Sequence, residues 1–155
     1  MKKILAIDPG NVQSAYVIWD GKNIIDKNIL ENNEFLDFID KLEIENVAIE
    51  MIASQGMAVG KTVFDTCLWV GRFQQTLLNK KCVVDLEYRS QIKMHICNSM
   101  RAKDSNICIA LVDRFGGIKH GKYGKGTKKD HGFFFGFAKD MWAAFAVAVY
   151  WFDNN

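Results

Sequence analysis

Short apolar runs separated by turn residues dominate the first part of the chain, and they predict three β-strands. Residues 3–8, KILAID, are too few for a helix and are followed by Pro9 and Gly10, which predicts a buried strand that ends at Asp8. Two further strand-like runs, 14–20 and 23–30, flank Asp20-Gly21, a strong hairpin signal. The first three strands are therefore expected to form an antiparallel meander.

Helical spacing and strand-like runs alternate through the rest of the chain. Phe35, Ile39 and Leu42 share one face of a helix predicted over about 33–43, with Asn32 or Asn33 as its N-cap. After it the pattern predicts a strand over 46–51, a helix over about 61–79, a strand over 82–88, and short helices over about 89–98 and 104–115. A last helix, over about 138–152, is apolar nearly all round, so it is expected to lie against the sheet. The fold class is thus α/β, with a mixed five-stranded sheet flanked by helices.

Length and composition favour one ordinary domain. The chain has 155 residues, of which 49% are apolar, and this suits a single domain spanning 1–155. Its four cysteines show no C-x-x-C spacing, which argues against a disulfide framework or a zinc site. Two lysines near the start resemble a signal sequence, but Asp8 and Pro9 interrupt the apolar run. No apolar run approaches the roughly 20 residues that span a bilayer, so we expect a soluble, cytoplasmic protein without membrane contact.

Positive charge is concentrated in two stretches, although the net charge is only +2. Residues 116–129, which we call the lysine–glycine loop, contain five lysines, five glycines and no acid, and residues 89–103 also lack carboxylates. Either stretch alone could be an ordinary solvated surface, whereas two in one small domain favour binding to a phosphate backbone. The DNA-contact candidates are Lys61, Arg89, Lys93, Arg101, Lys103, Lys119, Lys122, Lys125, Lys128 and Lys129.

Residues 48–62, AIEMIASQGMAVGKT, end in Gly-Lys-Thr and invite comparison with a phosphate-binding loop. That loop requires a glycine, four intervening residues and then Gly-Lys-Thr, so that backbone N–H groups surround the phosphates. Here Gln55 stands at the first position, and Gly56 is one residue too close. We therefore expect no nucleotide partner and interpret the segment as a glycine-containing loop that leads into a helix.

Three carboxylates stand where a charge is costly. Asp8 and Glu50 each follow an apolar run at the end of a predicted strand, and Asp140 opens the apolar last helix. Each alone could be a helix cap or a turn former. If the first and fourth strands are neighbours in the sheet, however, their carboxylates meet. Clustered oxygen ligands suit Mg²⁺ or Mn²⁺, and a pair of such ions can assist phosphodiester cleavage.

Three segments carry a resemblance to a known family: ILAIDPGN, VAIE at the end of the fourth strand, and AKDMWAAFAVAV in the last helix. Together with the element order they resemble the RuvC-type Holliday-junction resolvases of the RNase H-like superfamily. More closely, the segments GMAVGKTVFDTCLWVGRF and KMHICNSMRAKDSNICIALVDRFG look like the small resolvases of bacteriophages and prophages of Gram-positive hosts. The resemblance implies an RNase H-like fold, a two-metal endonuclease acting on branched DNA, and a homodimer.

When the family's motif is carried over residue by residue, three of its four metal ligands match acids in this chain and the fourth does not. Asp8 matches the acid that bridges both metals, Glu50 the second ligand, and Asp140 the first ligand on the last helix. The family has another aspartate three residues on, where this chain has Ala143. Because a methyl group cannot bind a cation, the resemblance implies a chain that binds branched DNA but cleaves it poorly. Whether Ala143 is natural or engineered stays open.

Two other functions remain open from the sequence. Ala143 also suits a module that binds junctions without cutting them. A nucleotide-binding domain of the actin-like type would share the strand-end acids, but such folds normally need two domains. The resemblance further suggests that the loop after Glu50 touches the junction centre and that the next helix forms the dimer interface. Met51, Ile52 and Met57 are candidates for an apolar wedge there, or for core packing.

Overall fold

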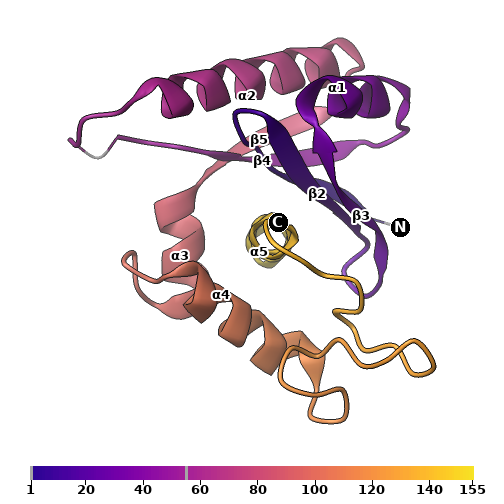
Figure 1. The fold of residues 1–155 in the computed structure, drawn as a ribbon. Helices are drawn as coiled ribbons and strands as arrows, with labels where there is room; N and C mark the ends of the chain where they lie inside the picture. Colours follow the sequence, from indigo (N-terminus) through magenta and orange to yellow (C-terminus); the bar gives the residue numbers. More distant parts are fainter. Residues whose placement is uncertain (1, 55) are drawn as a thin grey trace.

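A five-stranded mixed sheet forms the centre of the computed structural model, which describes residues 2–54 and 56–155 (Figure 1). The strands are β1 (Ile4–Asp8), β2 (Gln13–Trp19), β3 (Ile24–Glu31), β4 (Asn46–Met51) and β5 (Val83–Tyr88), in the order β3-β2-β1-β4-β5. The first three pair antiparallel, whereas β4 runs parallel to both β1 and β5. The predicted α/β, RNase H-like sheet with its N-terminal meander is thus confirmed.

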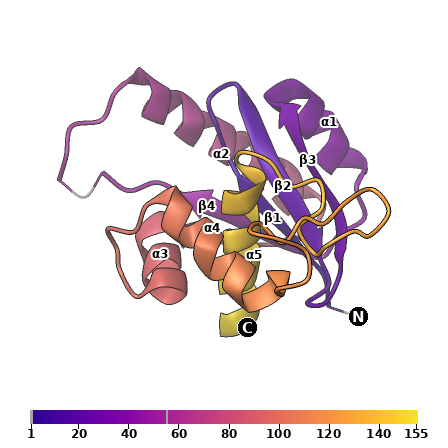
Figure 2. The same cartoon turned by 60° about the horizontal axis from the view of Figure 1, so that its bottom comes forward.

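Helices cover both faces of the sheet. They are α1 (Asn32–Lys41), α2 (Lys61–Asn79), α3 (Arg89–Cys97), α4 (Asp104–Leu111) with the π-helical turn η1 (Val112–Gly116), and α5 (Met141–Asn154). Figures 1 and 2 show α1 and α2 together over one face and α5 against the other, with α3 and α4 outside α5. The last helix therefore has protein on nearly every side, which explains why it is apolar nearly all round.

Alternation along β1 divides the core into two layers. Leu5 and Ile7 point toward α1 and α2, whereas Ile4 and Ala6 point toward α5, and all four side chains are fully buried. Phe145 of α5 is also fully buried, and burial of one such side chain contributes about 1.5 to 3 kcal/mol. The acid-bearing ends of β1 and α5 are thus fixed to a well-packed core.

The N-cap prediction for α1 is wrong. Glu31 caps the helix, because its carboxylate accepts hydrogen bonds from the backbone N–H groups of Asn33 and Glu34. Asn32 is buried instead, where its amide donates to the Gly10 carbonyl at 2.9 Å. A cap rule based on residue type favours asparagine, whereas the fold uses that residue to hold a distant turn.

Several smaller expectations can also be compared with the structure. The last helix begins at Met141, three residues later than predicted, and the helix predicted over 104–115 ends in the π-helical turn. All four cysteines are free, and Cys82 is the buried one. Across residues 2–54 and 56–155, no helix combines the length and apolar character that a membrane crossing requires.

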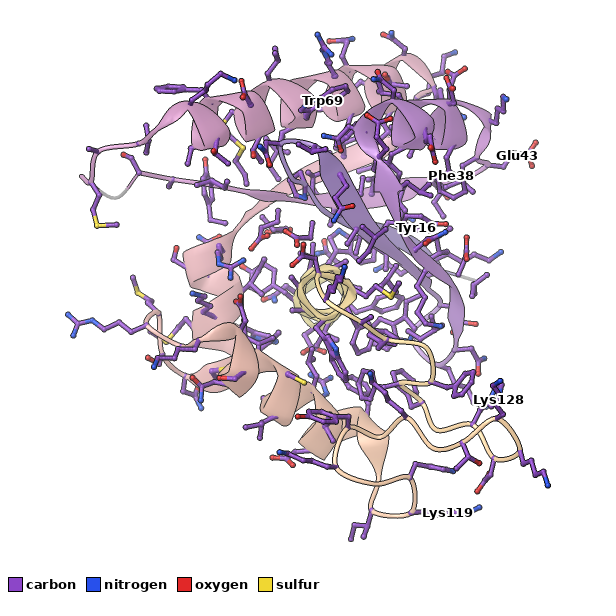
Figure 3. The ribbon with its side chains drawn as sticks, viewed as in Figure 1. Tyr16, Phe38, Glu43, Trp69, Lys119 and Lys128 are labelled. Atoms are coloured by element: carbon purple, nitrogen blue, oxygen red, sulfur yellow. The ribbon has the colours of Figure 1, made fainter. Side chains whose placement is uncertain are left out.

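Backbone hydrogen bonds tie the second half of the lysine–glycine loop to the segment that follows it. Phe134 N–H donates to the Gly124 carbonyl at 3.0 Å, and Gly132 N–H donates to the Lys125 carbonyl at 2.9 Å. A Cβ atom on Gly132 would lie 2.1 Å from the Gly124 carbonyl oxygen, so no larger residue fits there. In Figure 3, Lys119 and Lys128 lie on two separate outer turns, both away from α5.

Candidate active site

Strand pairing brings Asp8 and Glu50 to the same edge of the sheet. β1 and β4 are parallel neighbours with Ile7 opposite Ile49, so each acid follows its paired residue directly. Asp8 is the last residue of β1, and Glu50 lies one residue before the end of β4. The predicted meeting of the first and fourth strand ends is therefore confirmed.

A buried hydrogen-bond network fixes the turn that follows Asp8. The Ser14 hydroxyl donates to the Asn32 side-chain oxygen at 2.6 Å and accepts from Gly10 N–H at 3.2 Å. A Cβ atom on Gly10 would lie 2.3 Å from the Gln13 carbonyl oxygen, so only glycine fits this turn. Because these buried polar groups are mutually satisfied, the backbone after Asp8 is held rigidly.

Asp140 joins the two strand-end acids from the N-terminal end of α5. It occupies the N-cap position, but its side chain makes no capping hydrogen bond. The residue before it, Lys139, has a left-handed backbone with φ of 47°, which is uncommon for a residue with a side chain. The carboxylate of Asp140 is thus not used to stabilise the helix. We call Asp8, Glu50 and Asp140 the acidic cluster.

The charge of Asp8 is influenced by both other members of the acidic cluster. Burial raises the pKa of Asp8 well above its usual value, and the carboxylates of Glu50 and Asp140 raise it further. The guanidinium of Arg89 acts in the opposite direction on the pKa of Asp8. Asp8 therefore stands among like charges with one cation nearby.

Arg89 is the cation that reaches into the acidic cluster. It is the first residue of α3 and follows β5, the neighbour of β4. One nitrogen of its guanidinium donates to Glu50 Oε1 at 3.1 Å, and another donates to a carboxylate oxygen of Asp104. Burial lowers the pKa of Arg89, but the carboxylates of Glu50, Asp104 and Asp8 outweigh this effect, so the pKa is raised above its usual value. One arginine thus bridges the sheet edge and the N-terminus of α4.

Asp104 is a site residue that the sequence analysis did not identify. It opens α4 and lies 15 residues from Arg89 along the chain. No spacing rule links these two residues, because their contact depends on how two short helices pack. An acid after a basic stretch also has an ordinary interpretation as a first-turn helix residue.

Ala143 faces the same region as the acidic cluster. A small cavity of about 40 Å³ is lined by Asp104, Ile107, Lys139, Asp140, Trp142 and Ala143. Ala143 lies one helical turn after Asp140, so both side chains share one face of α5. A carboxylate at position 143 would therefore point toward Asp104 and Asp140.

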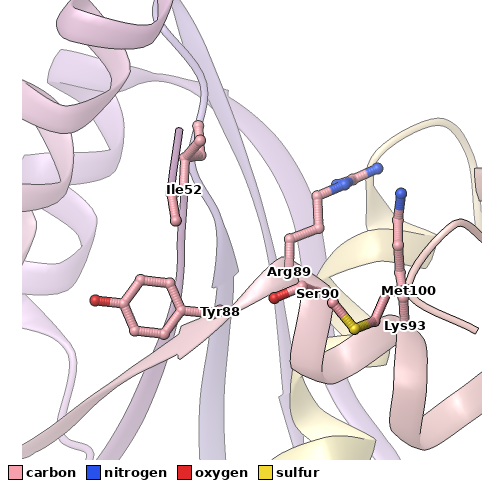
Figure 4. A pocket seen from close by; sticks show the side chains of 7 residues that line it. Ile52, Tyr88, Arg89, Ser90, Lys93 and Met100 are labelled. Atoms are coloured by element: carbon pink, nitrogen blue, oxygen red, sulfur yellow. The ribbon is translucent and has the colours of Figure 1, made fainter. Parts of the chain in front are cut away.

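A larger pocket adjoins Arg89 on the side of α3. Its volume is about 160 Å³, and its lining includes Ile52, Tyr88, Arg89, Ser90, Lys93 and Met100. Figure 4 shows that the charged ends of Arg89 and Lys93 extend to the same side, whereas Tyr88 points the other way. Two cations and a hydroxyl thus border a hollow beside the acidic cluster.

The acidic cluster matches a hard divalent ion in the type of its donors. Carboxylate oxygens are the ligands that Mg²⁺ and Mn²⁺ prefer, and a bound cation would relieve the crowding of charge around Asp8. In the arrangement of residues 2–54 and 56–155, however, no three Asp, Glu, His or Cys side chains are close enough to ligate one ion. Arg89 meanwhile holds one oxygen of Glu50. The three carboxylates are thus suitable ligands for a divalent ion by type, but one oxygen of Glu50 is already bound by Arg89.

The structure separates the DNA-contact candidates into groups. Arg89 and Lys93 border the pocket, and Arg101 and Lys103 lie in the connection between α3 and α4. Lys61, exposed at the start of α2, pairs with Asp65 at 2.6 Å. The remaining five, Lys119, Lys122, Lys125, Lys128 and Lys129, are in the lysine–glycine loop. Within the stretch 89–103, Arg89 contacts the acidic cluster and Lys93 lines the pocket beside it.

Some lysines of the lysine–glycine loop have partners within the protein. Lys119 pairs with Asp130 at 3.1 Å, whereas Lys122 and Lys125 lie over the ring of Tyr123 at 5.3 and 5.9 Å. Lys128 and Lys129 are exposed. Among the wedge candidates, Met51 packs against the core, Ile52 lines the pocket, and Met57 is 75% exposed.

Comparison with known proteins identifies the fold. No family model and no curated protein matches the chain. Among solved structures, Thermus thermophilus RuvC in complex with a Holliday-junction substrate matches with a TM-score of 0.69 and 11% identity, over 97% of this chain and 92% of that one. A second Thermus thermophilus RuvC structure matches with a TM-score of 0.65 and 12% identity, over 96% and 92%. The chain therefore has the RuvC fold over nearly its whole length.

Proposed function

We propose that this chain is a single-domain, structure-specific endonuclease of branched DNA that depends on Mg²⁺ or Mn²⁺ and acts as a homodimer. The observation that carries the proposal is the convergence of Asp8, Glu50 and Asp140 at one edge of a RuvC fold. The similar Thermus thermophilus protein was solved with a Holliday-junction substrate, which supports branched DNA as the partner. The segments GMAVGKTVFDTCLWVGRF and KMHICNSMRAKDSNICIALVDRFG add the prediction of a phage or prophage relative.

In this proposal each acid has a defined role. Asp8, whose charge is influenced by both other carboxylates, would be the central ligand of a divalent ion, and Glu50 and Asp140 would be its further ligands. A divalent ion bound there would supply Lewis-acid stabilisation of the charge that develops on the scissile phosphate. The rigid turn after Asp8 and the packed base of α5 keep these oxygens in position.

We further propose that cleavage by this chain is weak because of Ala143. This position faces Asp140 and Asp104 across a cavity of about 40 Å³, so the missing carboxylate would belong to the cluster. Loss of one metal ligand removes electrostatic stabilisation of the transition state, and removal of a single oxyanion-hole donor, which is a comparable electrostatic loss, costs about 10² to 10³ in rate. Binding of DNA does not need this oxygen, since a neutral residue beside a phosphate avoids charge repulsion.

The proposed dimer interface is the outer face of α2. Phe64 and Leu68 are 63% and 57% exposed, and they stand one helical turn apart on this helix. Exposed apolar side chains in a row indicate a surface that another protein covers. Phe64→Lys is expected to convert a dimer to a monomer in analytical ultracentrifugation, while the control Gln91→Lys, at an exposed position of α3, leaves the dimer intact. A wild-type chain that is monomeric at all concentrations contradicts this part of the proposal.

The experiment that tests the function compares the wild-type chain with Ala143→Asp on a synthetic four-way junction. Binding is measured in EDTA and cleavage in Mg²⁺ or Mn²⁺. We expect both proteins to bind and Ala143→Asp to cleave at least about 100-fold faster. Normal turnover by the wild-type chain would show that Ala143 is not a defect.

A non-cleaving junction-binding module is the second candidate, and Ala143 is the observation that favours it. If both proteins bind the junction and neither cleaves it, this alternative replaces the nuclease. A melting curve with ATP and Mg²⁺ tests the nucleotide-binding interpretation, because a bound nucleotide must raise the apparent stability. We expect no such shift.

A further inference from the structure

Arg89 makes two ion pairs that join separate parts of the candidate site. Its guanidinium binds Glu50 of β4 at 3.1 Å and Asp104 at the start of α4. Glu50 is buried, so solvent screens this first pair less than it screens an ordinary surface pair. Arg89 also lies close enough to Asp8 for each to act on the charge of the other. An internal cation therefore stands within the acidic cluster.

This position conflicts with a divalent ion on the same carboxylates. The Glu50 oxygen that accepts from Arg89 cannot at the same time be fully available to a metal. In addition, a guanidinium next to Glu50 repels any cation that approaches. The charge of an arginine is retained at every ordinary pH, so only a movement of the side chain can remove it from the site.

The pocket beside Arg89 offers the side chain another environment. Lys93 and Ser90 line it together with Arg89, and Figure 4 shows the two charged ends on the same side. A second cation makes this hollow unfavourable for Arg89 unless an anion is present as well. Two cations and a hydroxyl are the groups that bind a phosphate, and an arginine fork can bind one through two hydrogen bonds.

We propose that Arg89 is the resident counter-ion of the acidic cluster, that it competes with the divalent ion for Glu50, and that the released guanidinium binds a DNA phosphate in the pocket with Lys93. Metal binding and DNA binding are then coupled through one side chain. This inference rests on the proposed nuclease function and adds a residue that regulates the same site. Asp104 is the positioning residue that holds the other side of the guanidinium.

The first test measures Mn²⁺ affinity without DNA, by the loss of the free-ion signal in electron paramagnetic resonance. We expect Arg89→Gln to bind Mn²⁺ about 10-fold more tightly than the wild-type chain, within the 5- to 150-fold range of ordinary coupling between sites. Arg89→Lys keeps the charge but loses the fork, and it should give an intermediate affinity. Melting in EDTA verifies that each variant is folded.

Arg72→Gln is the matched control for this measurement. Arg72 is exposed on α2, stacks on Trp69 at 4.6 Å, and makes no ion pair with a described residue. The same chemical change at this position should alter Mn²⁺ affinity less than twofold. If Arg89→Gln and Arg72→Gln behave alike, or if Arg89→Gln binds Mn²⁺ more weakly, the competition is overturned.

The second test measures junction binding with and without Ca²⁺, an ion used here to support binding without cleavage. The wild-type chain should bind the junction several-fold more tightly with Ca²⁺, and Arg89→Gln should lose most of that gain. An equal gain in both proteins overturns the phosphate role of Arg89.

The failure of this inference can be distinguished from the failure of the proposed function. Mn²⁺ binding that Glu50→Gln and Asp8→Asn weaken, but that Arg89→Gln does not strengthen, overturns the inference and leaves the nuclease standing. If no variant binds Mn²⁺ at this site, the metal-dependent function falls and the inference falls with it.

Discussion

The acidic cluster and the lysine–glycine loop are both charged regions, but they are built in opposite ways. In the cluster, Asp8, Glu50 and Asp140 come from distant parts of the chain, and Arg89 offsets their charge. In the loop, five lysines are neighbours in sequence and project from a frame held by glycines. Pairing between strands creates the first region, whereas local composition creates the second. The two regions therefore respond to different substitutions.

The largest effect is expected from Asp8→Asn made together with Ala143→Asp. The neutral amide removes the central charge of the cluster, so we expect cleavage of a four-way junction to fall at least about 100-fold relative to Ala143→Asp alone. Junction binding in EDTA should stay equal or become tighter. Single-turnover kinetics measures the cleavage rate, and a binding isotherm measures the affinity for the junction. If affinity falls as much as the cleavage rate, the acidic cluster also carries DNA binding and is not functionally separate from the lysine–glycine loop.

The next effect concerns charge in the lysine–glycine loop. Each lysine that contacts a phosphate should contribute about 0.9 to the slope of log affinity against log salt on duplex arms. We expect Lys128→Ala to lower this slope by about that amount, whereas Lys119→Ala lowers it less, because Asp130 already pairs with Lys119. Equal slopes for Lys128→Ala and the wild-type chain would exclude Lys128 as a DNA contact.

A third substitution tests whether the frame of the loop matters. Gly132→Ala places a Cβ atom against the Gly124 carbonyl, so we expect a loss of about 1 to 3 kcal/mol in stability and weaker junction binding. Gly71→Ala is the control, because its Cβ meets no neighbouring atom and alanine favours a helix. The control should melt at the same temperature or higher, and similar melting of both variants would show that the loop adapts freely.

The smallest expected effect concerns Asp153, a carboxylate whose pKa is shifted in the direction opposite to that of Asp8. Burial and neighbouring acids raise the pKa of Asp8, whereas hydrogen bonds from Arg114 lower the pKa of Asp153 to about 2, with His95 adding to the effect. A depressed pKa stabilises the fold above the unfolded-state pKa of about 3.9, and this stabilisation is lost as the pH falls toward 2.

We therefore expect Asp153→Asn to lower stability at pH 7 by about 1 kcal/mol, since solvent around half-exposed Arg114 screens the pair. The difference from the wild-type chain should shrink between pH 4 and pH 2 as Asp153 becomes protonated. Denaturant melts at several pH values measure it, and a constant difference down to pH 2 would contradict the assignment to this ion pair.

The sequence was sufficient to predict the sheet and two of its acids. Asp8 and Glu50 each follow a run of apolar residues, and alternation together with turn residues identified the strands that end there. Parallel pairing of β1 and β4 then places the two carboxylates at one edge. Such signals are local, so they can be recognised without knowing the fold.

The contacts of Arg89 and Asn32 could not be predicted in the same way. The basic stretch around Arg89 predicts a DNA contact, which stays a prediction, and the packing of α3 and α4 adds contacts with Glu50 and Asp104 that no local pattern indicates. Asn32 has the residue type of an N-cap, but the turn at Gly10 uses its amide. Both residues have more than one favourable partner, and only the tertiary structure decides between them.

The hairpin at the end of the lysine–glycine loop has a consequence for how this molecule could be altered. Backbone hydrogen bonds from Gly132 and Phe134 to Lys125 and Gly124 close this hairpin, so residues 126–131 form a turn that is attached at one place. We expect this turn, which carries Lys128 and Lys129, to accept exchange or a change of length with little effect on the helix that presents Asp140. Substrate preference could therefore change by exchange of this turn while the chemistry of the sheet edge stays constant.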